Sequence, residues 1–192
     1  MISAPGHFFY LLLLIAAIFS TSLGVVIGRE RRNLPGSRWL IAQLWGVAIW
    51  SLGYALELIE PNLPSKILWA KVEYIGIATI PVVWFLFILD YSGGEFSGKR
   101  LLRYAIWSVP AITLILAWTN ESHGLIWQRL WLDNGGDPVI MMVEHGSWFW
   151  VHLAFSYGLL LASTLLTIRM IASGSSKNSL DGPFMLASVV IP

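Results

Sequence analysis

Two glutamates lie inside long apolar stretches of the sequence and are the residues best placed to do chemistry. Glu57 follows Tyr54 by three residues and Glu73 follows Trp69 by four, so in a helix each acid shares a face with an aromatic residue. If these stretches cross a membrane, an ionisable group is costly unless it faces the bundle interior, water or a partner. One hypothesis is a polar-ligand or proton site at Glu57 and Glu73, lined by Tyr54, Trp69 and Tyr74.

The same two acids have other possible roles. Lys71 is close enough in the sequence to form a purely structural ion pair with Glu57 or Glu73. A small transporter or an integral membrane enzyme could also use the two acids to handle protons or substrate. Residue spacing alone does not choose among these alternatives.

Three histidines follow the fourth apolar run, but their spacing does not favour a metal site. His145 and His152 are seven residues apart, about 10.5 Å along a helix, whereas metal-binding helical pairs are usually three or four residues apart. His152 lies inside an apolar run, so we expect it to donate a hydrogen bond within the bundle or to act as a switch at low pH. His123 and Trp127, from the preceding connection, complete the candidate ligand-binding set.

The composition identifies an integral membrane protein. Of the 192 residues, 56% are hydrophobic and 12% are charged, whereas about a quarter of the residues of a soluble domain are charged. The absence of cysteine excludes disulfide frameworks, thiolate metal sites and cysteine nucleophiles. No glycine-rich phosphate loop or catalytic triad is evident, so no catalytic residue, metal or cofactor is predicted. The basic residues form short membrane-flanking clusters, which argues against a nucleic-acid partner.

Five apolar runs are long enough to cross a bilayer as helices, and a sixth begins near the end of the sequence. We therefore predict an all-α polytopic transmembrane bundle that forms one membrane-embedded domain over residues 1–192. A connection of about thirty residues is expected to form a packed cap containing a short interfacial helix or a strand pair. The predicted runs are 7–28, 39–59, 67–89, 101–118, 148–171 and, in part, 183–192, and the long connection is 119–147.

The basic residues predict the orientation of the bundle. Nine of the 12 lysines and arginines fall at alternate connections, and the other connections hold only Lys66, Lys71 and Arg129. By the positive-inside rule, the N-terminus and the long connection lie outside a prokaryotic inner membrane. The candidate site then belongs to the outer half, and the run that starts at Pro183 points outward.

Small residues predict close helix packing in the first span, and two prolines predict kinks in later spans. Ser20, Gly24 and Gly28 form a stripe of small side chains, which suits either a homodimer face or close packing inside one bundle. Pro81 and Pro110 fall in the middle of predicted spans, where each removes a backbone hydrogen bond and tends to kink the helix. Such a kink can be a hinge or a static feature of shape.

An ordered set of segments resembles the N-terminal seven-helix membrane region found ahead of sensor histidine kinases and sometimes ahead of diguanylate cyclases. The resemblance covers nearly the whole chain, and the stretch around Asn120 and His123 contributes most to it. The matching segments are Leu44–Glu57, Trp69–Gly76, Pro81–Trp84, Leu89–Tyr91, Ile106–Pro110, Trp118–Trp127 and Gly146–His152.

This resemblance implies the input half of a membrane sensor, cut within the sixth of seven spans. It implies a cytoplasmic output domain in the full-length protein and a possible homodimer in the bilayer. It supplies no ligand, so the stimulus is an unknown small molecule or a physical signal acting at the outer half. A passive membrane anchor for a cytoplasmic enzyme is the remaining alternative.

Overall fold

The computed structural model describes residues 5–34, 36–92, 100–136 and 138–172, which form five helices and a small hairpin. The predicted helix bundle is confirmed, and the strand pair anticipated in the long connection is present beside it. The helices are α1 (Pro5–Glu30), α2 (Ser37–Ile59), α3 (Leu63–Tyr91), α4 (Arg100–Trp118) and α5 (Ser147–Ala172). The connection contains the 3-10 turn η2 (Asn120–Ser122) and strands β1 (Trp127–Asp133) and β2 (Ile140–His145).

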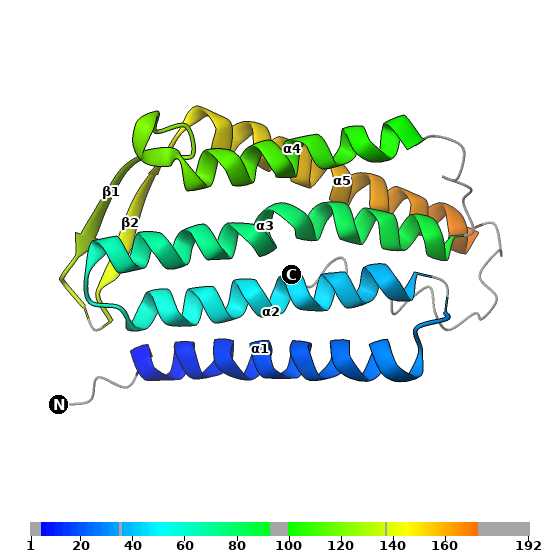
Figure 1. Ribbon diagram of the computed structural model, residues 1–192, viewed down its shortest axis with the longest axis horizontal. Helices are drawn as coiled ribbons and strands as arrows, with labels where there is room; N and C mark the ends of the chain where they lie inside the picture. The colour runs from blue at the N-terminus through cyan, green and yellow to red at the C-terminus, as the bar shows by residue number, and fades with distance from the viewer. Residues whose placement is uncertain (1–4, 35, 93–99, 137, 173–192) are drawn as a thin grey trace.

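The central helix of the bundle is α3. Figure 1 shows α1, α2 and α3 lying side by side in succession, with α4 and α5 on the other side of α3. Buried residues run along the whole length of α3, whereas α1 contacts mainly α2. Any relative movement of α2, α4 or α5 therefore has to be accommodated by α3.

Four of the helices are long and apolar enough to cross a membrane: α1, α2, α3 and α5. The described apolar part of α4 is shorter, Tyr104–Trp118, so the prediction of five complete crossings stays a prediction. Large hydrophobic side chains are exposed along the outside of the bundle, as expected for a lipid-facing surface. The sixth run, 183–192, lies outside the described residues.

Helix α3 begins one helical turn before the predicted apolar run 67–89. Asn62 caps α3 by accepting a hydrogen bond from the Ser65 amide at 3.0 Å, and Pro64 lies in the first turn. Both features favour helix initiation, although neither residue belongs to the apolar run. As a result Lys66 lies within α3 instead of in a connection, and Glu73 is ten residues, or about 15 Å, from Leu63.

Glycines let α2 and α3 approach closely. A Cβ atom added at Gly76 would lie 2.4 Å from the Gly46 carbonyl oxygen, closer than real atoms approach. One added at Gly53 would lie 2.7 Å from the Glu73 Cγ. The absence of side chains at these positions brings the backbone of α2 against the carboxyl-bearing part of α3.

The small-residue stripe of α1 faces α2. Ser20 and Gly24 are buried, and a Cβ atom at Gly24 would lie 3.6 Å from the Leu44 Cβ. Gly28 faces Ile41 in the same way, at 3.9 Å. Packing inside one bundle therefore accounts for the stripe, and the dimer alternative gains no support from it.

Both mid-span prolines lie inside helices, Pro81 in α3 and Pro110 in α4, and both are buried. Just before the first, the Thr79 hydroxyl donates to the Ile75 carbonyl at 2.7 Å. Three residues after the second, Thr113 donates to the Val109 carbonyl at 2.8 Å. These hydroxyls add local hydrogen bonds next to turns that each lose one backbone donor.

The connection between α4 and α5 forms a compact cap, which we define as residues 119–146. Strands β1 and β2 pair antiparallel, with one irregularity between Trp127 and Arg129. The Gly146 amide then donates to the Ile126 carbonyl at 2.8 Å, which closes the cap onto the start of α5. We call the end of the bundle that carries the cap the capped end. The opposite end, where α1 ends and α2 begins (Figure 1), carries Arg29 and Arg38, and we call it the basic end.

Candidate functional site

The two acids singled out in the sequence meet across the α2–α3 interface. Glu57 and Glu73 are each only 7% exposed, and their carboxyl groups lie close enough to interact electrostatically. Tyr54 lies near both carboxyl groups, although 42% of its surface is exposed. The structure therefore brings three of the predicted site residues together.

A buried lysine completes this group, and the sequence analysis missed it. Lys66 is fully buried, at 0% exposure, and its Nζ donates to the Glu57 carbonyl oxygen at 2.6 Å. It also lies close enough to interact electrostatically with the Glu57 carboxyl group. The signal was present, because Lys66 precedes Glu73 by two helical turns, but it required knowing that α3 begins at Leu63.

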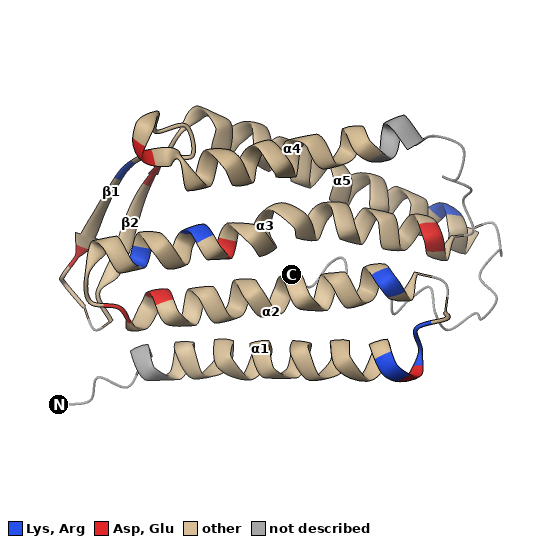
Figure 2. Cartoon of the chain, viewed as in Figure 1, with Lys and Arg blue, Asp and Glu red and all other residues tan. Residues whose placement is uncertain are grey.

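One carboxyl oxygen of the acidic pair accepts no hydrogen bond from the described residues. The Glu73 Oε1 atom is buried and has no hydrogen-bond partner among the described residues. Buried polar atoms are nearly always hydrogen-bonded, because leaving one unpaired costs about 1–3 kcal/mol. Figure 2 shows that charged residues gather at the two ends of the bundle, with both signs on the capped half of α3. The pair thus has unused hydrogen-bonding capacity in a mostly apolar interior.

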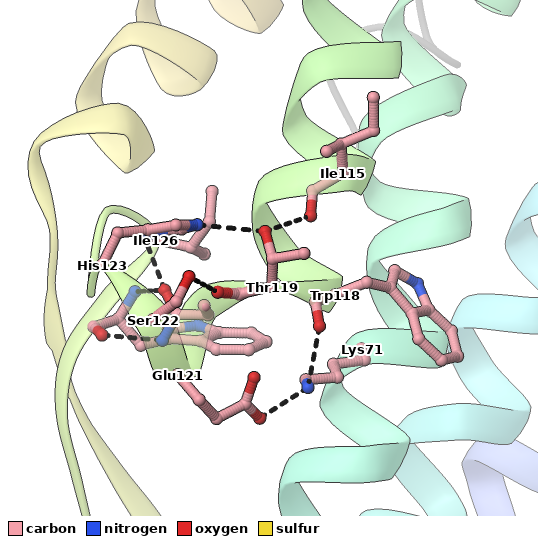
Figure 3. A network of polar contacts seen from close by, with 10 residues as sticks. Lys71, Ile115, Trp118, Thr119, Glu121, Ser122, His123 and Ile126 are labelled. Carbon is pink, nitrogen blue, oxygen red and sulfur yellow. Dashed lines mark hydrogen bonds and ion pairs between the residues drawn. The ribbon is translucent and has the colours of Figure 1, made fainter.

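Lys71 pairs with Glu121 rather than with Glu57 or Glu73, so the structural ion pair predicted from the sequence was wrong. Its Nζ lies 2.5 Å from the Glu121 Oε1 and donates to the Trp118 carbonyl oxygen at 3.2 Å (Figure 3). The hydrogen bond from Lys71 to Glu121 holds the pKa of the Glu121 carboxyl group below its ordinary value. Lys71 thereby fastens α3 to the end of α4 and to the cap.

A single asparagine organises the base of the cap. The Asn120 Oδ1 accepts hydrogen bonds from the Ile126 and Trp127 amides, both at 3.0 Å, and its Nδ2 donates to the Trp127 carbonyl at 2.9 Å. Trp127 then packs edge-on against Tyr74, with ring centroids 5.1 Å apart. These two predicted site residues do meet, but they form a packing contact between the cap and α3.

His123 lies in the cap, directly after η2, whereas Trp69 lies one helical turn before Glu73 on α3. The Leu125 amide donates to the His123 Nδ1 at 3.1 Å, so Nε2 carries the ring hydrogen and lies 3.1 Å from the Thr119 hydroxyl (Figure 3). Trp69 is partly buried on α3. The cap surface around His123 is hollowed into an open pocket of about 410 Å³, whose lining includes Asn120, Glu121, His123, Trp127, Gln128 and Arg129.

His152 belongs to a separate polar chain between α4 and α5. The Trp148 Nε1 donates to the Thr113 hydroxyl at 2.9 Å, and the same hydroxyl lies 3.4 Å from the His152 Nδ1. On the other side of the ring, Nε2 lies 3.4 Å from the Ser156 hydroxyl. His145, by contrast, stacks on a phenylalanine ring at 3.6 Å, and burial lowers the pKa of its imidazole.

The basic end carries a second contact between α2 and α3. Asp90 Oδ2 accepts hydrogen bonds from the Arg38 Nη2 and the Trp39 Nε1, both at 2.8 Å. The Arg38 guanidinium also lies 4.9 Å from the centre of the Trp39 ring. This contact joins the first turn of α2 to the last turn of α3, so the two helices are linked by polar groups at both ends.

The described residues contain no group of three or more His, Asp or Glu side chains that could hold a metal ion. The two buried carboxyl groups can form hydrogen bonds and exchange protons, and Lys66 supplies a positive charge beside Glu57. The pocket on the cap is a different feature, because it is formed by side chains at the surface.

Comparison with known proteins agrees with this membrane architecture. No curated protein and no solved structure matches the chain. The family described as the N-terminal 7TM region of histidine kinase matches residues 12–192, nearly the whole sequence and all four of the long apolar helices in whole or in part. The chain therefore belongs to the N-terminal seven-transmembrane region of histidine kinases, a membrane-embedded signalling family.

Proposed function

We propose that this chain is the input region of a histidine kinase and that its stimulus acts at the capped end. The observation that carries this proposal is the buried group of Glu57, Glu73 and Lys66, which joins α2 to α3 close to the cap. Buried ionisable groups inside a membrane bundle are costly to keep and usually serve a function. The positive-inside rule assigns the capped end to the outside, where a stimulus would arrive.

The arrangement of the helices suggests how a stimulus would reach the cytoplasmic side. A change at the acidic pair alters the spacing of α2 and α3 at the capped end. Because α3 also contacts α4 and α5, its displacement is shared with the rest of the bundle. At the basic end, the contact of Arg38 and Trp39 with Asp90 keeps α2 and α3 together, so the pair pivots rather than separates. The output domain of the kinase reads this movement.

A sensor needs two states that differ in their affinity for the stimulus. The capped end offers such a difference, since the acidic pair is compatible with close helix packing only while its charges are compensated. A transporter would instead pass the ligand or proton through the bundle, and an anchor would be indifferent to the acids. These three functions predict different results for the same pair of substitutions.

The decisive experiment uses the intact protein that carries this region, reconstituted in vesicles. Replacing Glu57 and Glu73 together by glutamine should change the rate of kinase autophosphorylation without creating or abolishing any flux across the membrane. Loss of flux in the double variant would favour a transporter. Unchanged regulation after exchange of the whole region for an unrelated membrane anchor would overturn the sensor proposal. Glu30, exposed at the basic end, provides the matched glutamate-to-glutamine control.

The assigned orientation has its own test. The sequence contains no cysteine, so single cysteines can be introduced without background labelling. Gln128→Cys on the cap and Asn33→Cys at the basic end are both at exposed positions. A membrane-impermeant thiol reagent applied outside intact cells should label only the cap variant, and labelling of only the Asn33 variant would reverse the topology.

A further inference from the structure

We propose that the Glu57–Glu73 pair is a proton-binding site in which the two carboxyl groups share one proton, exchangeable from the capped end. This proposal deepens the proposed function, on which its signalling role rests, by naming the proton as the ligand. The binding of the proton itself depends only on the local geometry and charge of the site.

The burial of two neighbouring acids favours a shared hydrogen. An ionised carboxylate is only an acceptor, so two of them side by side have no donor between them. Glu57 and Glu73 interact electrostatically across the α2–α3 interface, where Glu73 packs against Gly53 and each acid is only 7% exposed. A single proton between them converts a repulsive contact into a hydrogen bond.

The charge balance of the neighbouring groups also indicates that the acidic pair binds one proton. Lys66 contributes one positive charge next to Glu57, and two ionised carboxylates would contribute two negative charges. One bound proton makes the three-residue group neutral, which is the least costly state in an apolar interior. Other titratable groups also lie nearby: Tyr54 and Tyr74 near the two acids, and Glu60 near Lys66.

The same features argue against a metal ion as the ligand. Metal sites for hard cations need several oxygen ligands arranged around the ion. Here the described residues bring only two carboxyl groups together, and the Lys66 amine beside Glu57 repels a cation. The unpartnered Glu73 Oε1 is explained by a pair that uses its other oxygens for the shared proton and so retains one free acceptor.

Loss of the proton gives the site its second state. The carboxylic acid transfers its proton to water, leaving two carboxylates and one ammonium group with a net charge of minus one. The carboxylates then repel each other across an interface where Gly53 leaves no side chain between α2 and Glu73. The capped ends of α2 and α3 separate, or admit water, until the new charge is solvated. External alkalinity thus opens this end of the bundle, and acidity closes it.

Infrared spectroscopy tests the shared proton directly. In vesicles containing the intact protein, the carbonyl stretch of a protonated carboxyl group should be present at neutral pH and should disappear as a single-proton titration on alkalinisation. Glu57→Gln and Glu73→Gln should each remove this band, whereas Glu30→Gln should leave it unchanged. A band that survives in both site variants overturns the proposal.

Two further measurements are needed. One decides the result if the site variants do not fold, and the other distinguishes failure of the proton site from failure of the sensor function. If the site variants do not fold, the wild-type band decides alone, and its absence at every pH overturns the proposal. Autophosphorylation is recorded in the same vesicles while the external pH is varied. A titrating band with a pH-independent kinase supports the proton site and overturns only its role as the stimulus. A pH-dependent kinase without the band overturns the proton site and leaves the sensor function standing.

Discussion

The α2–α3 pair is joined by polar groups at both ends, and the two junctions differ in charge balance and burial. At the basic end, one aspartate meets one arginine, and the Arg38 side chain is 63% exposed. At the capped end, two acids meet one lysine, and all three side chains are buried. A balanced, solvated junction holds the helices in register under most conditions, whereas an unbalanced, buried junction depends on an added ligand.

The energetic consequences of the two junctions are also unequal. Exposed ion pairs typically contribute about 0.2–1 kcal/mol, because water and salt screen them and the long side chains lose entropy. Removing one partner from a buried charged group costs about 3–5 kcal/mol, because an uncompensated charge remains. Substitutions along α2 and α3 should therefore have their largest effects near the cap.

Replacing Lys66 by methionine should be the most damaging single change. It removes the donor to the Glu57 carbonyl and the positive charge beside the acidic pair, so we expect a loss of about 3 kcal/mol of stability. Unfolding of the purified protein in mixed micelles measures this loss. Lys71→Met, whose partner Glu121 is 64% exposed, is the matched control and should have a clearly smaller effect. Equal losses of stability in the two variants would contradict the claim that the buried Lys66 contributes more than Lys71.

Gly53→Ala, which adds one methyl group, should cause the next largest loss of stability. A Cβ atom there would lie 2.7 Å from the Glu73 Cγ, so α2 must move or Glu73 must change rotamer, at about 1–3 kcal/mol. The control is Gly158→Ala on α5, where an added Cβ meets nothing within 4 Å. Because alanine favours helices over glycine, the control should be neutral or stabilising in the same unfolding assay.

Neutralising Asp90 should have a modest effect that depends on salt. Asp90→Asn removes the charge opposite Arg38 but keeps an oxygen that can accept from Trp39, so we expect a loss of about 0.2–1 kcal/mol. The loss should shrink at high ionic strength, as measured by unfolding at two salt concentrations. A salt-independent loss would mean that the Trp39 hydrogen bond, rather than the charge, carries the contact.

The smallest expected effect is the pH dependence of the cap. The hydrogen bond from Lys71 lowers the pKa of Glu121 below its ordinary value of 4.5, so the stabilisation is fully present above that pH. It is lost as pH falls through the lower folded-state pKa. Carbon NMR titration of the Glu121 carboxyl group measures this midpoint, and Lys71→Met should return it toward 4.5. An unchanged midpoint in that variant would show that Lys71 is not the cause.

Several features of the site could be anticipated from local patterns. The apolar runs predicted the helix bundle, and the helical spacing placed Glu57 and Glu73 on defined faces near one end. The turn residues and aromatic content of the connection predicted a packed cap, which proves to contain a strand pair. These predictions succeeded because each depends on residues that are close together in the chain.

The partners of the charged residues could not be predicted in the same way. Lys71 was expected beside the acids, yet it pairs with Glu121, fifty residues later, while Lys66 occupies the position next to Glu57. The difference arises from a start of α3 one turn earlier than the apolar pattern suggests, set by the Asn62 cap. The early start places Lys66 inside α3, and the rotation of the helix, about 100° per residue, decides which neighbour each lysine faces.

The amino-acid sequence by itself determined that this protein is a membrane bundle, that its acids lie near one end, and that it resembles a kinase input region. Those properties follow from composition, periodicity and the order of short segments. Tertiary structure alone decided that both acids are buried at the α2–α3 interface, that Lys66 compensates only Glu57, and that the stripe of small residues on α1 packs against α2. Contacts between helices depend on their rotation and on the close approach that glycines permit, and neither is encoded in the local pattern of any one segment.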